Sequence, residues 1–222
     1  MNSEATLEET QSLHIKKYIY LGVKRLFDIV LSLIGSIFLL PIALIVKISY
    51  ILNKDYESIF FSQDRIGKNG KTFKFYKFRS MVVNADEVLK ELLKNDKEAR
   101  KEYKLNKKLK NDPRITKMGK ILRRTSLDEL PQLINVLRGD MSLIGNRPYL
   151  PREKEDMGIY YDTILKTKPG LTGYWQVNGR SNTTFEERLK LEEYYSNHAS
   201  LKMDIKILFK TVYVVLFHKG AE

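Results

Sequence analysis

The sequence predicts an α+β fold in which an N-terminal re-entrant membrane helix precedes a mostly helical domain with a small β-hairpin. An uncharged run covers residues 29–46, and β-rich segments flank Asn69-Gly70, whereas much of the remaining chain places apolar residues at helical spacing. We divide the chain into a polar leader (1–17), a membrane helix with its flanks (18–54) and a cytosolic, membrane-associated domain (55–222).

Composition narrows the possible functions. The 222 residues are 43% hydrophobic, enough for one folded domain, and carry a formal net charge of +12 at a pI near 9.6. This charge favours an anionic partner, which could be nucleic acid, anionic lipid or a phosphorylated substrate. Cysteine is absent, so disulfide and thiolate chemistry are excluded, and the three isolated histidines disfavour a histidine metal site or a His-based triad.

The uncharged run is the expected membrane segment. As a helix it would extend about 27 Å, close to the ~30 Å hydrocarbon core. A cleavable signal peptide fits badly because the run starts late and no small-residue cleavage site follows it, and a fully buried soluble helix is the alternative.

Lysine and arginine residues lie on both sides of the run, so the positive-inside rule places both flanks in the cytosol. Pro41 lies inside the run and removes a backbone donor that lipid cannot replace, which favours a bend there. We therefore expect a helix that enters the membrane, bends at Pro41 and returns to the same face.

A β-hairpin is expected after the membrane segment. Residues 59–61 and 72–78 have the composition of short strands around Asn69-Gly70, a hairpin turn signal. Gly70-Lys71-Thr72 is similar to the end of a phosphate-binding loop, but Arg65 occupies the position of the required glycine, which excludes a P-loop.

A single helix is expected from Ala85 to about Leu109, with Asp86 and Glu87 in its first turn. Its second half and the residues just after it are basic, with Lys97, Arg100, Lys101, Lys104, Lys107, Lys108 and Lys110. A solvated surface explains each cation separately, whereas together, beside a membrane anchor, they would attract anionic headgroups at about 1 kcal/mol each.

Residues 125–133 hold the most informative pattern. The adjacent carboxylates Asp128 and Glu129 lie at the expected start of a helix that Gly139 ends, and they follow Lys120, Arg123 and Arg124. Carboxylates among so many cations are candidates for chemistry on a phosphate.

Helix capping is the structural alternative for the same residues. Ser126 and Glu129 fit a capping box, and Asp128 fits an N-cap. Pro131 weakens the capping box, because it would then lie inside the helix and cost a hydrogen bond. Local pattern alone favours capping over catalysis.

Two glycine-containing segments follow. Residues 145–148 form an expected turn that presents Arg147, and residues 170–180 form an expected loop or hairpin with polar and aromatic side chains. Each segment alone is weak support for a site.

Two helices are expected toward the C-terminus. Thr184 and Glu187 form a capping box for a helix that runs through Tyr195, and Glu186 and Glu187 receive no functional role. Residues 203–217 are largely apolar and suit a core helix and a helix in the membrane interface equally well.

Seven motifs occur in one order along the chain: Lys24-Arg25-Leu26-Phe27-Asp28, Gln63-Asp64-Arg65-x-Gly67, Lys77-Phe78-Arg79-Ser80-Met81, Asp112-Pro113-Arg114-Ile115-Thr116, the Asp128-Glu129 segment, Gly139-Asp140-Met141-Ser142-Leu143-Ile144-Gly145 and Gln176-Val177-Asn178-Gly179-Arg180. In this order they resemble the bacterial sugar transferase family, specifically its small monotopic polyprenyl-phosphate phosphoglycosyl transferases. The resemblance runs from Lys24 to nearly the C-terminus and implies an enzyme at the cytosolic face of the bacterial inner membrane.

The resemblance implies a reaction as well. Members transfer a sugar 1-phosphate from a UDP-sugar to undecaprenyl phosphate or another polyprenyl phosphate and release UMP, which initiates capsule, exopolysaccharide or O-antigen synthesis. Asp128 would be the nucleophile that forms an aspartyl phosphosugar ester, and Glu129 would help to deprotonate the lipid phosphate. Mg²⁺ near Asp128 would offset the diphosphate charge, since a carboxylate ~4 Å from a phosphate charge is repelled by about 4 kcal/mol per unit pair at an effective dielectric of 20.

Further site residues follow from the same resemblance. Arg123 and Arg147 match phosphate-contacting positions, and the other motif positions that would bind substrate are Lys77, Arg79, Gln176 and Arg180. The segment 173–181 and the Gly220-Ala221 ending resemble members that use UDP-galactose or UDP-glucose, so a UDP-hexose donor is expected. Membrane lipid is an implied partner, nucleic acid is not, and a homo-oligomer remains open.

The chain departs from the family pattern in two places. Asn146 stands where members commonly have proline, so the Arg147 turn is less rigidly specified, and Leu40-Pro41 stands where small members often have Ser-Pro. The additional N-terminal transmembrane bundle of larger members has no counterpart in these residues, so we expect the small catalytic form.

Two other functions are compatible with part of the sequence. A membrane-anchored module that binds nucleic acid or anionic lipid without catalysis explains the net charge and the anchor, but it leaves Asp128 and Glu129 unexplained. A catalytically idle scaffold in polysaccharide assembly is the other alternative.

Overall fold

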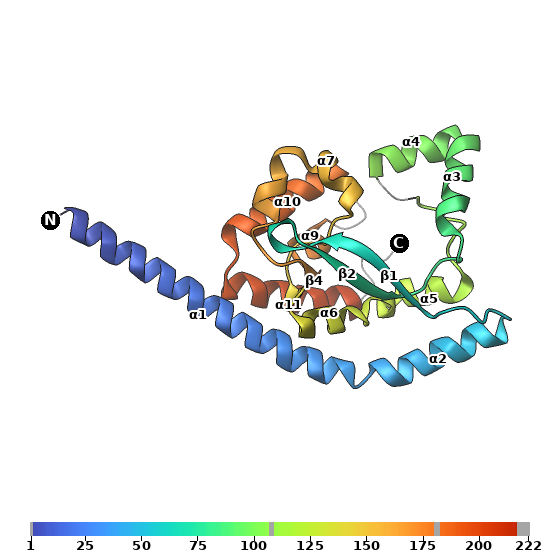
Figure 1. The fold of residues 1–222 in the computed structure, drawn as a ribbon, viewed down its shortest axis with the longest axis horizontal. Helices are drawn as coiled ribbons and strands as arrows, with labels where there is room; N and C mark the ends of the chain where they lie inside the picture. The colour runs from blue at the N-terminus through green and yellow to red at the C-terminus, as the bar shows by residue number, and fades with distance from the viewer. Residues whose placement is uncertain (1, 107–108, 180–182, 217–222) are drawn as a thin grey trace.

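The computed structural model describes residues 2–106, 109–179 and 183–216. Within them the fold is mostly helical with two small sheets, as the sequence predicts (Figure 1). The helices and strands are α1 (Asn2–Ser36), α2 (Leu39–Leu52), β1 (Phe60–Ile66), β2 (Thr72–Phe78), α3 (Ala85–Asn95), α4 (Lys97–Asn106), α5 (Lys117–Arg124), α6 (Gln132–Arg138), β3 (Ser142–Ile144), α7 (Lys154–Met157), α8 (Tyr161–Ile164), β4 (Gly170–Thr172), α9 (Tyr174–Asn178), α10 (Phe185–His198) and α11 (Leu201–Leu216). Short 3-10 helices are η1 (Lys68–Gly70), η2 (Leu127–Glu129), η3 (Pro151–Glu153) and η4 (Gly158–Tyr160).

The apolar run is broken, but not at Pro41. The break lies at residues 37 and 38, and Pro41 occupies the first turn of α2. A proline is tolerated in a first turn, whereas in a continuous helix its ring would clash with the carbonyl of Ile37, so the chain breaks before it. Among the described residues no single helix is long and apolar enough to cross a membrane, but Ile15–Ser36 and Leu39–Leu52, bent by 45°, together have the required length and composition.

Helix α1 is fastened to the domain by the charged residues that precede the apolar run. Lys24 forms an ion pair of 2.6 Å with the buried Asp204 of α11. Arg25 donates to two carbonyls at the end of α6, and Asp28 accepts from the Leu143 N–H of β3 at 2.8 Å. This motif therefore docks α1 against α6, β3 and α11. No break separates residues 2–17 from the start of the apolar run, because α1 extends from Asn2 to Ser36.

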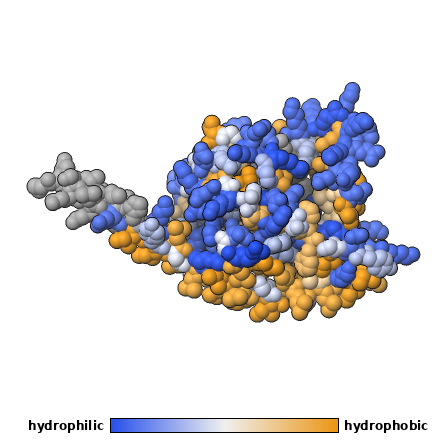
Figure 2. Space-filling model, viewed as in Figure 1, coloured by the Kyte–Doolittle hydropathy of each residue, from blue (hydrophilic) through white to orange (hydrophobic). Residues whose placement is uncertain are grey.

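The side of α1 and α2 that faces away from the domain is apolar. Exposed side chains include Leu26, Leu33, Ile37 and Leu40, and Figure 2 shows a largely apolar rim along the lower edge, over the C-terminal part of α1 and much of α2. Single exposed apolar residues are common on protein surfaces, but a contiguous apolar area of this extent indicates contact with a membrane or with another protein.

The predicted hairpin is confirmed. β1 and β2 pair antiparallel from Phe60↔Phe78 to Ile66↔Thr72, and the turn between them contains Asn69 and Gly70 at positive φ of 57° and 78°. The first strand is longer than expected because its polar second half is still paired with β2. α2, the hairpin and α5 then pack together through Val46, Tyr50, Ile59, Phe78 and Leu122, which places the end of α5 beside β2.

The single helix expected from Ala85 to Leu109 is wrong. It is divided into α3 and α4 at Asp96, whose backbone is extended and whose side chain accepts from the Ala99 N–H at 2.9 Å. Asp96 thus caps a new helix in place of continuing the old one. In Figure 1, α4 lies on the opposite side of the domain from α1 and α2, and α3 runs from it down one edge toward α5. Lys107 and Lys108 lie outside the described residues.

The loop or hairpin expected at residues 170–180 is also different. β4 pairs in parallel with β3, and α9 follows directly. Glycine makes the pairing possible, because an added Cβ at Gly170 or Gly173 would collide with the backbone of Gly145. Sequence pattern did not predict a parallel pair between segments so short.

The C-terminal helices agree with the sequence. The Thr184–Glu187 capping box is present at the start of α10, which continues past Tyr195 to His198. In α11, Ile207 is buried, whereas Ile205 and Phe209 are exposed. The buried face of α11 suits the predicted role as a core helix, and its exposed apolar face suits the predicted role as a membrane-interface helix.

Candidate functional site

Asp128 and Glu129 lie on η2, in the turn between α5 and α6. Ser126 adopts a left-handed φ of 58° and its side chain makes no capping bond, and α6 begins only at Gln132. Both capping interpretations are therefore wrong for α6. The carboxylates lie in the first turn of the short 3-10 helix η2 and not in the helix that Gly139 ends. Pro131 explains the difference, because a helix that started before it would lose a backbone bond.

Lys77 joins the two carboxylates. From β2, its Nζ lies 2.6 Å from Oε1 of Glu129 and 3.3 Å from Oδ2 of Asp128. Strand β2 brings this lysine to η2 because residues at alternate positions of the strand face η2 and α6. One ammonium group thus holds both carboxylates in place.

Asp128 is buried, with 6% of its surface exposed. Burial raises the pKa of its carboxyl, and the charge of Glu129 raises it further, whereas Lys77 and Arg123 lower it. Arg123, at the end of α5, is oriented by a 2.9 Å hydrogen bond from Nε to Oγ of Ser80. A desolvated carboxylate beside two cations is suited to attack an electrophile that brings negative charge with it.

A second group of cations adjoins this pair. The guanidinium of Arg147 lies 5.8 Å from the Trp175 ring centre, and that of Arg188 lies 5.2 Å from the same ring. Burial, and then the charge of Arg147, lower the pKa of Arg65 to about 9. Arg147 also contributes to lowering the pKa of Arg123, so the two groups interact electrostatically.

These arginines have unused donors. Arg65 Nε and Arg188 Nε and Nη2 are buried and lack a hydrogen-bond partner among the described residues. Buried donors are nearly always paired, so a bound anion would satisfy what the protein leaves open. Arg147 and Arg188 at Trp175, together with Arg65 over Phe75, therefore form a candidate phosphate site that is linked electrostatically to Arg123 beside Asp128.

The Arg147 turn is held from α10. Asn146 Nδ2 donates to Oγ of Ser196 at 2.6 Å, and the buried Glu192 accepts from the Arg147 N–H at 3.2 Å and from the Tyr149 hydroxyl at 2.6 Å. Burial raises the pKa of Glu192 to about 7. Hydrogen bonds from α10 thus supply the rigidity that a proline at position 146 would give.

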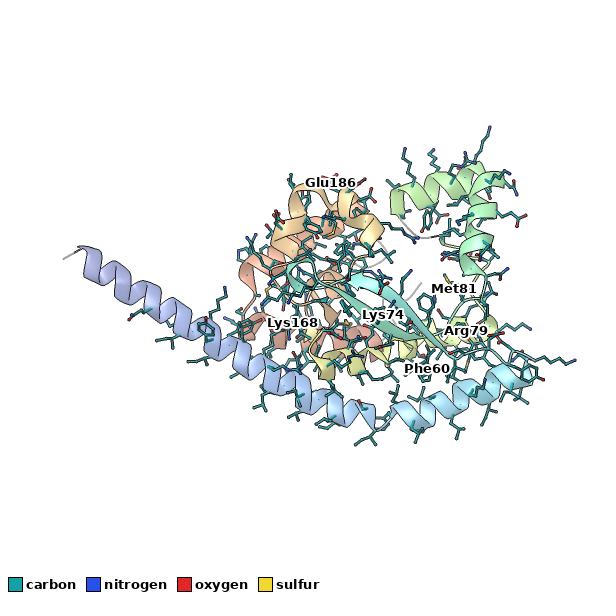
Figure 3. The ribbon with its side chains drawn as sticks, in the orientation of Figure 1. Phe60, Lys74, Arg79, Met81, Lys168 and Glu186 are labelled. Atoms are coloured by element: carbon teal, nitrogen blue, oxygen red, sulfur yellow. The ribbon has the colours of Figure 1, made fainter. Side chains whose placement is uncertain are left out.

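The remaining predicted site residues are placed differently. Arg79 lies at the foot of the hairpin (Figure 3), where Nη2 binds both oxygens of Asp55 at 2.9 Å and Nε donates to the Ser58 carbonyl. Its donors are committed to the protein. Gln176 follows Trp175, and its buried Oε1 has no hydrogen-bond partner within the part of the chain that the structure describes. Arg180 lies outside that part.

A metal site made by the protein alone is not formed. No group of three or more His, Cys, Asp or Glu side chains among the described residues is arranged to hold a metal ion. Asp128 and Glu129 do supply two neighbouring carboxylates, and Mg²⁺ is commonly held by one or two carboxylates together with substrate phosphates. The donor set fits Mg²⁺ that arrives with a phosphate ligand.

Sequence reasoning assigned no site role to Arg65, Arg188 or Glu192. A signal for Glu192 was available, since it lies with Leu189 and Tyr195 on the buried face of α10, where a carboxylate needs partners. Arg65 and Arg188 gave no such signal, because their burial depends on Tyr149, Phe75 and Trp175 from distant segments.

Comparison with known proteins gives a consistent picture. The profile of the family described as bacterial sugar transferase matches residues 19–218. The undecaprenyl-phosphate galactose phosphotransferase of Salmonella typhimurium is 49% identical over 199 residues, which is 90% of this chain and 41% of the relative. The exopolysaccharide production protein ExoY of Sinorhizobium fredii is 41% identical over 198 residues, covering 89% of this chain and 87% of the relative.

A third relative is the UDP-glucose:undecaprenyl-phosphate glucose-1-phosphate transferase of Escherichia coli, 37% identical over 207 residues, or 90% of this chain and 41% of the relative. The chain thus spans about two fifths of the length of the relatives from Salmonella and Escherichia.

Proposed function

Because the chain belongs to the bacterial sugar transferase family, we propose that it transfers a hexose 1-phosphate from a UDP-sugar to a polyprenyl phosphate through a covalent intermediate on Asp128. The observation that carries the proposal is the burial of Asp128 between Lys77 and Arg123, beside an arginine cluster with unused donors. The names of the relatives from Salmonella and Escherichia support the substrate classes, since both refer to undecaprenyl phosphate.

The first displacement takes place at the phosphorus that carries the sugar. A carboxylate oxygen of Asp128 forms a bond to this phosphorus, and the phosphoanhydride bond breaks, so that UMP leaves with the electron pair. Lys77 and Arg123 offset the repulsion between carboxylate and diphosphate. Arg147 and Arg188 bind the phosphate of the departing UMP. The product on the protein is an aspartyl phosphosugar ester.

The second displacement regenerates the carboxylate. A phosphate oxygen of the polyprenyl phosphate attacks the same phosphorus, and the Asp128 ester oxygen leaves. Glu129 accepts the proton of the incoming lipid phosphate where that phosphate is monoprotonated, and Lys77 keeps Glu129 within reach of the reacting centre. Mg²⁺ held by Asp128 and the donor phosphates would neutralise diphosphate charge.

The acceptor requires that the site lie at a membrane surface. The bent pair α1–α2 has the length and composition of a re-entrant element, and its exposed side is apolar. Lys24, Arg25 and Asp28 fasten the pair to the domain. We propose that α1–α2 enters and leaves the cytosolic face of the inner membrane and thereby presents Asp128 to the polyprenyl phosphate.

UDP-galactose or UDP-glucose is the proposed donor, and capsule, exopolysaccharide or O-antigen synthesis the proposed process. A panel of UDP-galactose, UDP-glucose and N-acetylated UDP-sugars, assayed for UMP release with lipid acceptor, tests the donor. Release from N-acetylated sugars alone would refute a hexose donor.

The chemistry is tested by intact-protein mass spectrometry of the full chain with UDP-sugar, Mg²⁺ and no acceptor. We expect an added mass of one hexose phosphate, lost when polyprenyl phosphate is supplied, and ping-pong kinetics. Asp128→Asn should abolish both the adduct and turnover, whereas Glu129→Gln should slow turnover more than adduct formation. A folded Asp128→Asn protein that turns over at a near wild-type rate would exclude Asp128 as nucleophile. No UMP release and no adduct in the wild type would favour the non-catalytic basic module.

A further inference from the structure

A pocket lies between α9, α10 and α11, apart from the candidate site at Asp128. It has a volume of about 490 Å³, within the usual range of ligand pockets, and its principal lining residues are Tyr174, Tyr194, His198, Lys202, Lys206 and Lys210. Tyr174 lines this pocket, whereas the adjacent Trp175 packs against Arg147 and Arg188. The two sites therefore lie on different sides of α9.

The walls of this pocket differ in chemistry. One wall is aromatic, with Tyr174 and Tyr194 ring centres 5.2 Å apart and Tyr194 stacked on His198 at 4.2 Å. The other is the lysine row of α11, in which Lys202, Lys206 and Lys210 recur once per helical turn. Lys210 binds Asn178 Oδ1 at 2.7 Å. No carboxylate lines the pocket, and the structure gives Lys202 and Lys206 no ion pair among the described residues, so the pocket is suited to an anion.

The position of the row on α11 identifies the kind of anion. Ile207 points into the core, and the roughly opposite face carries the exposed apolar stripe Leu201, Ile205, Phe209 and Val212. The lysines lie on the flank between these two faces. On a helix in a membrane interface, this flank is at headgroup depth, where lysines extend to the phosphates.

The flank of α11 that does not carry the lysines faces α1. Asp204 lies on this flank and forms an ion pair of 2.6 Å with Lys24 of α1. The apolar stripe of α11 is thus held beside α1, whose exposed apolar residues form part of the rim in Figure 2. A ligand in the pocket can therefore contact lysines and aromatic rings at one end and an apolar, membrane-facing surface at the other.

We propose that this pocket binds the phosphate headgroup of an anionic phospholipid, with the acyl chains along the exposed stripe of α11. Lys202 and Lys206 pair with the phosphate, and Tyr194 with His198 contacts the glycerol portion. The proposal rests on the membrane association in the proposed function and not on the chemistry at Asp128. It makes the pocket a lipid site separate from the acceptor.

The test uses the full chain in an uncharged detergent and native mass spectrometry. Phosphatidylglycerol is the anionic probe, phosphatidylcholine the zwitterionic one, and UMP a soluble phosphate. The pocket variant is Lys202→Gln/Lys206→Gln/Lys210→Gln, and the matched control is Lys94→Gln/Lys97→Gln/Lys101→Gln, which removes the same charge from exposed positions of α3 and α4. A single Lys206→Glu variant serves if the triple variant unfolds.

We expect the wild type to retain phosphatidylglycerol about tenfold better than phosphatidylcholine, the pocket variant to lose about tenfold, and the control variant to change less than about twofold. Equal loss in both triple variants would overturn the pocket and leave the membrane association standing. Retention of neither lipid by the wild type would overturn both. Displacement of phosphatidylglycerol by UMP would assign the pocket to a soluble nucleotide and overturn the lipid proposal.

Discussion

The buried carboxylate of Asp128 places function and stability in opposition at a single residue. Its pKa is raised chiefly by burial, so folding favours the protonated form, and the ionised form, which is the proposed nucleophile, destabilises the fold. Lys77 and Arg123 reduce this cost without removing it, as the direction of the shift shows. Sites of this kind are more stable when the reactive group is replaced.

Replacement of Asp128 by Asn should therefore raise the melting temperature at pH 8 while turnover falls by about 10³-fold or more. The stability contribution of a raised carboxyl pKa is lost as pH rises through the folded value, so the gain from Asp128→Asn should increase from acidic to alkaline pH. Thermal melts across this range measure it. Asp64→Asn, which alters an exposed aspartate paired with Lys74, is the control and should change neither the melting temperature nor turnover. A lower melting temperature for Asp128→Asn would instead show that the interactions of the carboxylate with Lys77 and Arg123 outweigh the cost of its burial.

Glu192 provides a second test of buried charge. Because its pKa is about 7 in the folded chain and 4.5 in the reference state, stability should fall by at most about 3 kcal/mol as pH rises from 4.5 to 7. Glu192→Gln keeps an acceptor for Arg147 and should remove this part of the pH dependence. Urea unfolding at several pH values measures it, with Glu193→Gln, outside the buried face, as control. An unchanged pH dependence in Glu192→Gln would show that the carboxyl is not buried as the structure has it.

At the scale of elements, the Arg147 turn is built from two segments far apart in the chain. Asn146→Ala removes the bond to Ser196 and should lower kcat/KM for the UDP-sugar about tenfold, because Arg147 loses its fixed orientation. Asn146→Pro should retain most of the activity, since a proline restricts the same turn directly. Steady-state kinetics with varied donor measure both variants. Equal loss in both would contradict a positioning role for Asn146.

The membrane element gives a topological prediction. Lys16 and Lys54 flank the bent pair and should both face the cytosol. The chain has no cysteine, so cysteines introduced singly at these positions can be labelled in intact cells. Neither should react with an impermeant reagent in the wild-type background. In a continuous straight helix Pro41 would lie in the interior, where a proline costs ~3 kcal/mol. Pro41→Ala removes this cost, so it should favour a straight crossing of the membrane, which exposes one of the two labels outside the cell. External labelling of either position without this change would refute the re-entrant arrangement.

The sequence predicts elements whose turn or cap residues are close together in the chain, and it does not predict features that depend on contacts between distant segments. Asn69-Gly70 determines the hairpin turn and Thr184 with Glu187 caps α10, so both could be predicted from a few adjacent residues. The start of α6 was misplaced because Pro131 and the left-handed Ser126 act together, and each was compatible with a helix alone. Likewise Asp128 was identified as a candidate from its neighbours in sequence, but its burial depends on β2 and α5.

The whole molecule depends on the attachment of α1 to the domain. Asp204 is buried and accepts from Lys24 at 2.6 Å, from the Tyr20 hydroxyl at 2.8 Å and from the Tyr195 hydroxyl at 2.7 Å. One carboxylate thus joins α1, α10 and α11. Since α1 also contacts α6 and β3, its orientation is linked to the turn that carries Asp128.

Lys24→Met should therefore destabilise the chain by about 3 to 5 kcal/mol, because a buried carboxylate is left without its cation. Lys24→Met with Asp204→Asn should recover most of this loss, since an amide needs no counter-charge and keeps an acceptor for the tyrosine hydroxyls. Lys16→Met, at an exposed position of the same helix, is the control. Denaturant unfolding of the four proteins, combined with adduct formation at Asp128, separates stability from alignment. If the double variant regains stability but not adduct yield, the ion pair also orients α1 for catalysis. If the stability of Lys24→Met is within about 1 kcal/mol of that of the wild type, α1 is held by its apolar contacts and the ion pair is dispensable.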